Sequence, residues 1–129
     1  MSEPHYLLRL PASGGMEAVP VSGSIPPDTL AALLQTDVTE RMRVPVMPEG
    51  LSADSVLCYF IDARGGDKAL PANFPGTCFY HTGCPVCGDL LLALCDADSD
   101  SAAVSGLTAA QAALLTDWLH EQFPAYFSE

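Results

Sequence analysis

The sequence predicts an α+β domain in which a small mixed or antiparallel sheet is packed by two main helices. Short apolar runs rich in β-branched and aromatic residues predict strands, and two longer segments carry apolar residues at helical spacing. The 10 glycines and 11 prolines among 129 residues supply turns between these short elements. With 49% hydrophobic and 16% charged residues the chain can bury a core of its own, so we expect residues 1–129 to form a single domain.

The N-terminal segment predicts two short strands. Residues 5–10 place their apolar side chains alternately, which is the pattern of a strand with one buried face. Residues 17–21 predict a second strand. Pro20 cannot donate a backbone hydrogen bond, so it either interrupts this strand or limits it to an edge of the sheet.

A helix is predicted after these strands. Pro26 and Pro27 suit a first helical turn because they have no N–H to satisfy, and Asp28 favours the positive end of the helix. An apolar stripe follows at helical spacing, formed by Leu30, Leu33, Leu34 and Val38.

The middle of the chain predicts further strands. Val44 and Val46 point one way, as in a short strand, and residues 56–61 are the clearest strand of the chain. Gly65–Gly66 predicts a tight reversal after it. Residues 89–96 are a continuous apolar run bounded by acids. Their composition favours a helix, but their length and bounding turns favour a buried strand, which we predict.

The second main helix is predicted near the C-terminal end. Thr108 and Gln111 have the spacing of a capping box, and Pro124 ends the helical pattern. One face of this helix carries Leu115, Trp118, Leu119 and Gln122.

The charge is strongly acidic. The net charge is −11, from 16 acidic against 5 basic residues, which disfavours ordinary DNA or RNA binding because phosphates are repelled. Such a chain is instead suited to binding a basic protein surface. The candidate contact residues are the acids outside the expected core strands: Asp62, Asp67, Asp96, Asp98 and Asp100.

The cysteines are expected to be reduced. No apolar stretch approaches the roughly 20 residues of a membrane helix, and the first residues lack a secretory pattern, so we expect a cytoplasmic protein that does not bind membranes. Cytosolic cysteines are normally thiols, and the odd count of 5 argues against a complete disulfide framework.

The string GCPVCG has the form of a zinc knuckle. Cys84 and Cys87 would supply two thiolates, completed by His81 or Cys95 and by Cys58. A redox pair is another interpretation, although thioredoxin-like folds place such a motif after their first strand. Because a second Cys-x2-Cys is missing, reduced cysteines in a turn and a core remain the simplest interpretation, and we expect no cofactor.

The order of motifs over residues 55–123 resembles a family of small uncharacterised domains carried by phages and conjugative elements of bacteria. The resemblance rests on "YFIDARGG", on Leu70–Asn73 (Leu-Pro-x-Asn), on Gly88–Leu92 (a Gly-Asp turn entering an apolar strand) and on the Leu107–Thr108 helix start. It implies an accessory protein of a mobile element. The segment "CFYHTGCPVC" departs from the family, so no role for its thiols is carried over.

Three functions are compatible with these patterns. The leading hypothesis is a non-enzymatic anti-defence inhibitor whose acidic surface binds a host protein, since no catalytic signature surrounds the histidines or cysteines. The second is a zinc-binding or thiol-dependent domain centred on Cys84 and Cys87. The third is a nucleotide-sequestering oligomer that uses the few cations, namely Arg41, Arg43, Arg64 and Lys68.

Overall fold

The computed structural model describes most of the chain. It covers residues 5–12, 14–21, 24–36, 38–44, 50–51, 55–64, 68, 70–73, 86–96 and 104–123. In chain order the elements are β1 His5–Leu10, β2 Glu17–Val21, α1 Pro27–Leu34, β3 Thr39–Arg43, β4 Ser55–Asp62, β5 Leu90–Asp96, β6 Val104–Ser105, β7 Leu107–Thr108 and α3 Ala109–Gln122.

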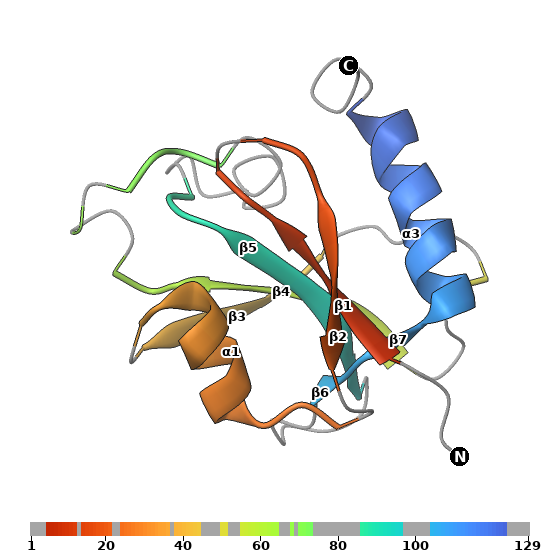
Figure 1. Cartoon of the computed structure of the whole chain (residues 1–129), viewed down its shortest axis with the longest axis horizontal. Helices are drawn as coiled ribbons and strands as arrows, with labels where there is room; N and C mark the ends of the chain where they lie inside the picture. Colours follow the sequence, from red (N-terminus) through yellow and green to blue (C-terminus); the bar gives the residue numbers. More distant parts are fainter. Residues whose placement is uncertain are drawn as a thin grey trace.

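The strands form one antiparallel sheet with the order β2-β1-β5-β4-β3 (Figure 1). The short strands β6 and β7 extend it by pairing with β5 and β1. The predicted α+β class is confirmed, and all pairings between the described strands are antiparallel rather than mixed. The strand β2 lies at an edge, as Pro20 required.

The central strand β5 is buried on both faces, which explains its continuous apolar run. Successive side chains of a strand point to opposite faces. Accordingly Leu90 and Leu92 join one apolar cluster, whereas Leu91 and Ala93 join another on the other face. The prediction that this segment is a strand is confirmed.

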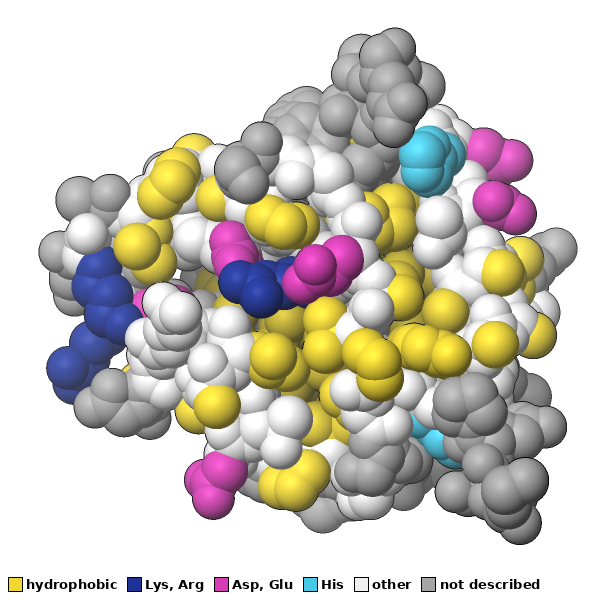
Figure 2. Space-filling model, viewed as in Figure 1, with side chains coloured by type: hydrophobic (Ala, Val, Ile, Leu, Met, Phe, Trp, Pro, Cys, Tyr) yellow, Lys and Arg dark blue, Asp and Glu magenta, His cyan; other side chains and the backbone are white. Residues whose placement is uncertain are grey.

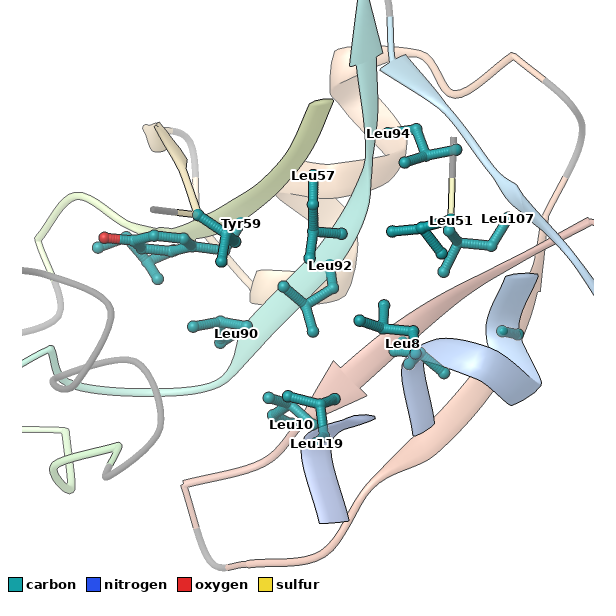
Figure 3. Close-up of a cluster of buried hydrophobic side chains, with 14 of the residues drawn as sticks. Leu8, Leu10, Leu51, Leu57, Tyr59, Leu90, Leu92, Leu94, Leu107 and Leu119 are labelled. Carbon is teal, nitrogen blue, oxygen red and sulfur yellow. The ribbon is translucent and has the colours of Figure 1, made fainter. Parts of the chain in front are cut away.

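Each of the two apolar clusters includes side chains of one helix, so α1 and α3 lie on opposite sides of the sheet (Figure 1). Leu30 and Leu34 of α1 pack in the cluster with Leu91. On the other face, Leu119 of α3 lies beside Leu10 of β1 (Figure 3). The buried face of α3 is formed by Ala112, Leu115 and Leu119.

The start of α3 follows the prediction closely. The Thr108 side chain accepts a hydrogen bond from the Gln111 N–H at 3.2 Å, and the Gln111 side chain accepts one from the Thr108 N–H at 2.9 Å. The predicted stop, Pro124, lies outside the described residues. Trp118 is partly buried as expected, but Gln122 is exposed and does not share the buried face.

The predicted apolar stripe of the first helix is wrong at its C-terminal end. The helix α1 ends at Leu34 because Gln35 adopts a left-handed conformation with φ 55, so Val38 is exposed and outside the apolar stripe.

Of the strand expected around Val44 and Val46, Val44 directly follows β3 and donates its backbone N–H to the Leu57 carbonyl of β4 at 2.9 Å, whereas Val46 lies outside the described residues. The strand β3 was not predicted because its charged sequence TERMR lacks an apolar alternation. At the edge of the sheet β3 is held by backbone pairing to β4 and needs no apolar pattern.

Within the described part of the chain, no helix is both long enough and apolar enough to cross a membrane.

Candidate functional site

A cleft with a volume of about 250 Å³ opens where the C-terminal end of α1 meets the ends of β1 and β4. We call it the α1 cleft. Its apolar walls are Leu33, Leu34, Leu70 and Pro71, and its charged lining residues are Arg9, Asp62 and Asp89. Apolar walls with a few converging polar groups are the usual composition of a ligand site. The α1 cleft is therefore the candidate site.

One wall of the α1 cleft is an ion-paired arginine. Arg9 Nε donates a hydrogen bond to Asp89 Oδ2 at 3.0 Å, and Arg9 Nη1 lies 3.6 Å from Glu17 Oε1. The other oxygen of Asp89 accepts the N–H of Ala12 at 3.1 Å. Basic and acidic side chains are accordingly in contact near the middle of the face in Figure 2. Arg9 is thus neutralised by acids of two other segments.

The opposite wall holds a buried carboxylate. The Asp62 side chain is only 3% exposed and lies 2.7 Å from Lys68 Nζ. It also accepts hydrogen bonds from Thr36 Oγ1 at 2.9 Å and from the Arg64 N–H at 2.8 Å. Burial raises the pKa of Asp62, but these hydrogen bonds and the charge of Lys68 outweigh the effect of burial. The pKa of Asp62 is therefore lower than the ordinary aspartate value of 3.8.

This geometry corrects the prediction for Asp62. We expected a surface acid available to a partner, but its carboxylate is buried and fully engaged inside the chain. The Lys68 ammonium also donates to the Gln35 carbonyl at 3.4 Å, so it supports the C-terminal end of α1 as well.

Asn73 is fully buried and is bonded to Gly88, one of the residues that line the α1 cleft. Asn73 Nδ2 donates to the carbonyl oxygens of Leu10 at 2.8 Å and of Gly88 at 3.0 Å. Backbone bonds reinforce this contact, because the Gly88 N–H donates to the Pro71 carbonyl at 2.7 Å. The Leu-Pro-x-Asn motif is therefore a structural clamp that joins the end of β1 to the turn before β5.

The same clamp uses the end of GCPVCG. Cys87 forms an isolated bridge with Ala72, and Gly88 adopts φ +93. A Cβ built on Gly88 would meet Leu70 Cδ1 at 2.9 Å, inside ordinary contact distance. Glycine is therefore favoured at position 88 because its φ is positive and because a side chain there would be too close to Leu70.

Replacing Gly88 by alanine is expected to destabilise the fold by about 1–3 kcal/mol, because a side chain at this φ is strained and Leu70 must move. Chemical denaturation measures the change. Gly50→Ala is the matched control, since Gly50 has φ +82 but nothing within 4 Å of its Cβ position. Equal losses in both variants would show that the contact with Leu70 contributes nothing.

The predicted zinc ligands are only partly within the described residues. Cys95 is buried in β5, whereas Cys87 precedes that strand. Because a strand rises about 3.3 Å per residue and zinc–sulfur bonds are about 2.3 Å, Cys95 cannot share a metal with Cys87. Cys95 is therefore removed from the predicted ligand set. His81 and Cys84 lie outside the described residues.

Cys95 has a different neighbour. The register pairs Val56 with Cys95 and Cys58 with Ala93, so the two cysteines are diagonal neighbours on one face of the sheet. A hydrogen bond from Cys58 lowers the pKa of Cys95 to about 7, helped by Arg41 and opposed by burial. Among the residues that the structure describes, no group of three or more His, Cys, Asp or Glu could hold a metal ion.

Those of the remaining predicted residues that the structure describes do not converge. Asp96 ends β5 opposite Ser55, at the other end of β4 from Asp62, so the predicted acids are not one cluster. Asp67, Asp98 and Asp100 lie outside the described residues. Of the cations proposed to hold a nucleotide, Lys68 is paired with Asp62 and Arg41 interacts with Cys95, while Arg64 is exposed. The side chain of Arg43 is outside the description.

Sequence reasoning missed Arg9 and Asp89 as cleft residues. They are 80 positions apart, and no local pattern links a cation in the first strand to an acid before β5. The Gly-Asp turn was noted as a motif, but its partner could not be identified.

Comparison with known proteins found no matching family model, no matching curated protein and no matching solved structure. The argument for function therefore rests on the charge and geometry of this chain.

Proposed function

We propose that the chain is a non-enzymatic accessory protein of a phage or mobile element that inhibits a host defence protein by binding its basic surface. The observation that carries the proposal is the distribution of charge. The net charge is −11. Two of the few cations, Arg9 and Lys68, are already paired with acids of the same chain. The charge presented to a partner is therefore acidic.

Acids on several elements support this proposal. Among the described residues, exposed acids include Glu17 at the edge strand, Asp28 at the start of α1, and Asp117 and Glu121 on α3. A surface of one sign attracts a partner of the opposite sign and raises the rate of encounter, an effect that falls as salt increases.

The contact surface that we propose is the acidic segment of Asp96, Asp98 and Asp100. Asp96 is the last residue of β5, at the end of the sheet far from the Asp62 carboxylate. The buried Asp62 is no longer part of the proposed surface, and Asp67 follows the opposite end of β4 in sequence. Asp96, Asp98 and Asp100, which are close together in sequence, therefore remain as the proposed contact residues.

The double variant Asp98→Lys/Asp100→Lys tests this surface. It is expected to lose a host partner that the wild-type chain captures from bacterial lysate, with retention falling at least about tenfold because attraction becomes repulsion. Retention is measured by quantitative mass spectrometry at about 0.15 M and about 1 M salt, where screening differs strongly.

Asp117→Lys/Glu121→Lys is the matched control. It changes the net charge by the same amount on an exposed face of α3. If this control variant still captures the host partner and the Asp98→Lys/Asp100→Lys variant does not, the proposal is supported. Capture that is insensitive to salt and to both variants would contradict it.

A further inference from the structure

Two buried cysteines on neighbouring strands share one face of the sheet. Cys58 of β4 is 4% exposed and Cys95 of β5 is 3% exposed, and both are free thiols. The register pairs Cys58 with Ala93, two residues before Cys95, so the two thiols are diagonal neighbours. The Cys58 thiol donates a hydrogen bond to the Cys95 sulfur. Two sulfur atoms therefore face each other inside the core.

An arginine lies beside this pair. Arg41 of the edge strand β3 is paired with Phe60, and paired residues of an antiparallel sheet carry their side chains on the same face. This face is the one that holds both cysteines, because Phe60 belongs to their cluster. The Arg41 guanidinium also donates a hydrogen bond to the Cys95 sulfur. A fixed positive charge is therefore available to compensate for a negative charge on the sulfurs.

The surroundings of the pair restrict the ion that it can bind. The other buried residues of its cluster are apolar, among them Leu91, Ala93 and Val104. In the part of the chain that the structure describes, no third His, Cys, Asp or Glu joins the two thiols. Zinc requires four ligands, and magnesium and calcium require oxygen ligands. Soft thiolates instead select Cu(I), which accepts two ligands in line.

The spacing of the pair favours a bridging ion over a disulfide. The Cα atoms of diagonal neighbours are about 7–8 Å apart, whereas disulfides require about 4.4–6.8 Å. Two metal–sulfur bonds in line, each about 2.3 Å for zinc and similar for copper, hold the sulfurs about twice as far apart as an S–S bond of about 2.05 Å. An ion between the sulfurs therefore spans this separation without movement of the strands.

We propose that Cys58 and Cys95 bind one Cu(I) ion between their sulfur atoms. Both thiols lose their protons and two copper–sulfur bonds form, while copper keeps its oxidation state, so no oxidant or reductant is consumed. The ion and the two thiolates together carry one negative charge, which the Arg41 guanidinium neutralises. None of these three residues lines the α1 cleft, and the inference does not depend on the proposed function.

The full chain with Cys78→Ser, Cys84→Ser and Cys87→Ser, which we call the triple-serine chain, retains only the proposed pair. Without oxygen, it is titrated against Cu(I) held by the coloured chelator bicinchoninate, and we expect it to take up one copper ion per chain. Adding Cys95→Ala removes one ligand and should weaken binding at least about tenfold. A folded triple-serine chain that takes up no copper would overturn the inference, as would equal binding after Cys95→Ala.

The wild-type chain provides a measurement that does not depend on the folding of the triple-serine chain. When the isotopically labelled protein is saturated with Cu(I), backbone signals of Cys58, Ala93 and Cys95 are expected to shift. Shifts confined to other parts of the chain would overturn the inference. Zn²⁺ that binds the triple-serine chain as tightly as Cu(I) would overturn the choice of ion.

Arg41 distinguishes a built site from two thiols that are merely close. In the triple-serine chain, Arg41→Gln is expected to weaken Cu(I) binding about tenfold because the bound complex loses its counter-charge, and Arg41→Lys should restore part of the affinity. Arg64→Gln is the matched control, since it removes the same charge from an exposed side chain beyond the end of β4. Equal affinity in the Arg41→Gln and Arg64→Gln variants would overturn the role of Arg41 in the site.

Discussion

Replacing Asn73 by alanine is expected to destabilise the protein by about 2–5 kcal/mol. The amide of Asn73 is fully buried and donates to the carbonyl oxygens of Leu10 and Gly88. Alanine removes both donors and leaves both acceptors buried, and each unsatisfied group costs about 1–3 kcal/mol. Urea denaturation of the two chains measures the change in unfolding free energy.

The exposed Gln122→Ala substitution is the control for Asn73→Ala, and its effect should stay within about 0.5 kcal/mol. Asn73→Asp separates donor loss from volume loss, because it keeps the shape of the side chain and removes the amide donors. It should destabilise at least as much as alanine. A loss below about 1 kcal/mol in both Asn73 variants would show that the clamp is not a stability element.

Replacing Asp62 by asparagine is expected to cost about 1–3 kcal/mol at neutral pH. The carboxylate is 3% exposed and is held by Lys68, Thr36 and the Arg64 N–H. The Lys68 side chain is 39% exposed, so water solvates its ammonium when the counter-charge is removed. The loss therefore comes mainly from asparagine, which must accept the same donors with a single oxygen. Urea denaturation at neutral pH gives the difference.

The loss from Asp62→Asn is expected to depend on pH. The pKa of Asp62 is lowered from 3.8 by its partners, so the folded chain favours the ionised form more than the unfolded chain does. This contribution is fully present above about 3.8, the unfolded pKa. It is lost as the pH falls through the lower folded pKa. The stability difference between wild type and Asp62→Asn should therefore shrink in acid. A difference that is constant with pH would contradict this account.

A double-mutant cycle with Lys68→Met assigns the part of this loss that comes from the ion pair. If Asp62 and Lys68 act together, the loss in the double variant is smaller than the sum of the single losses. Strict additivity would place the role of Asp62 in its bonds to Thr36 and to the Arg64 N–H instead.

Several elements could be predicted because their signals are local. The capping box needs only Thr108 and Gln111, which are three residues apart and bond each other in the structure. For β2, Pro20 predicted either an interrupted strand or an edge strand, and the structure shows the edge strand. The apolar run of β5 predicted burial on both faces, which the clusters around Leu91 and Leu92 confirm.

Other elements could not be predicted because they depend on contacts with segments that are distant in sequence. The strand β3 has a charged sequence and exists through its register with β4, in which Arg41 faces Phe60. Asp62 was expected at the surface because an acid before a turn usually is exposed. Its burial is offset by the Arg64 and Lys68 donors of the turn that follows β4 and by Thr36, which is 26 residues away.

By itself the sequence determined the presence of the main strands, the two helix starts and the acidic charge, because periodicity, caps and composition act over a few neighbouring residues, whereas the antiparallel pairing of the strands was left open. Only the tertiary structure decided the α1 cleft and the separation of Cys95 from Cys87. The bond from Arg9 to Asp89 spans 80 residues and that from Asn73 to Leu10 spans 63. Such contacts are set by the order of strands in the sheet, and no local pattern of residues specifies that order.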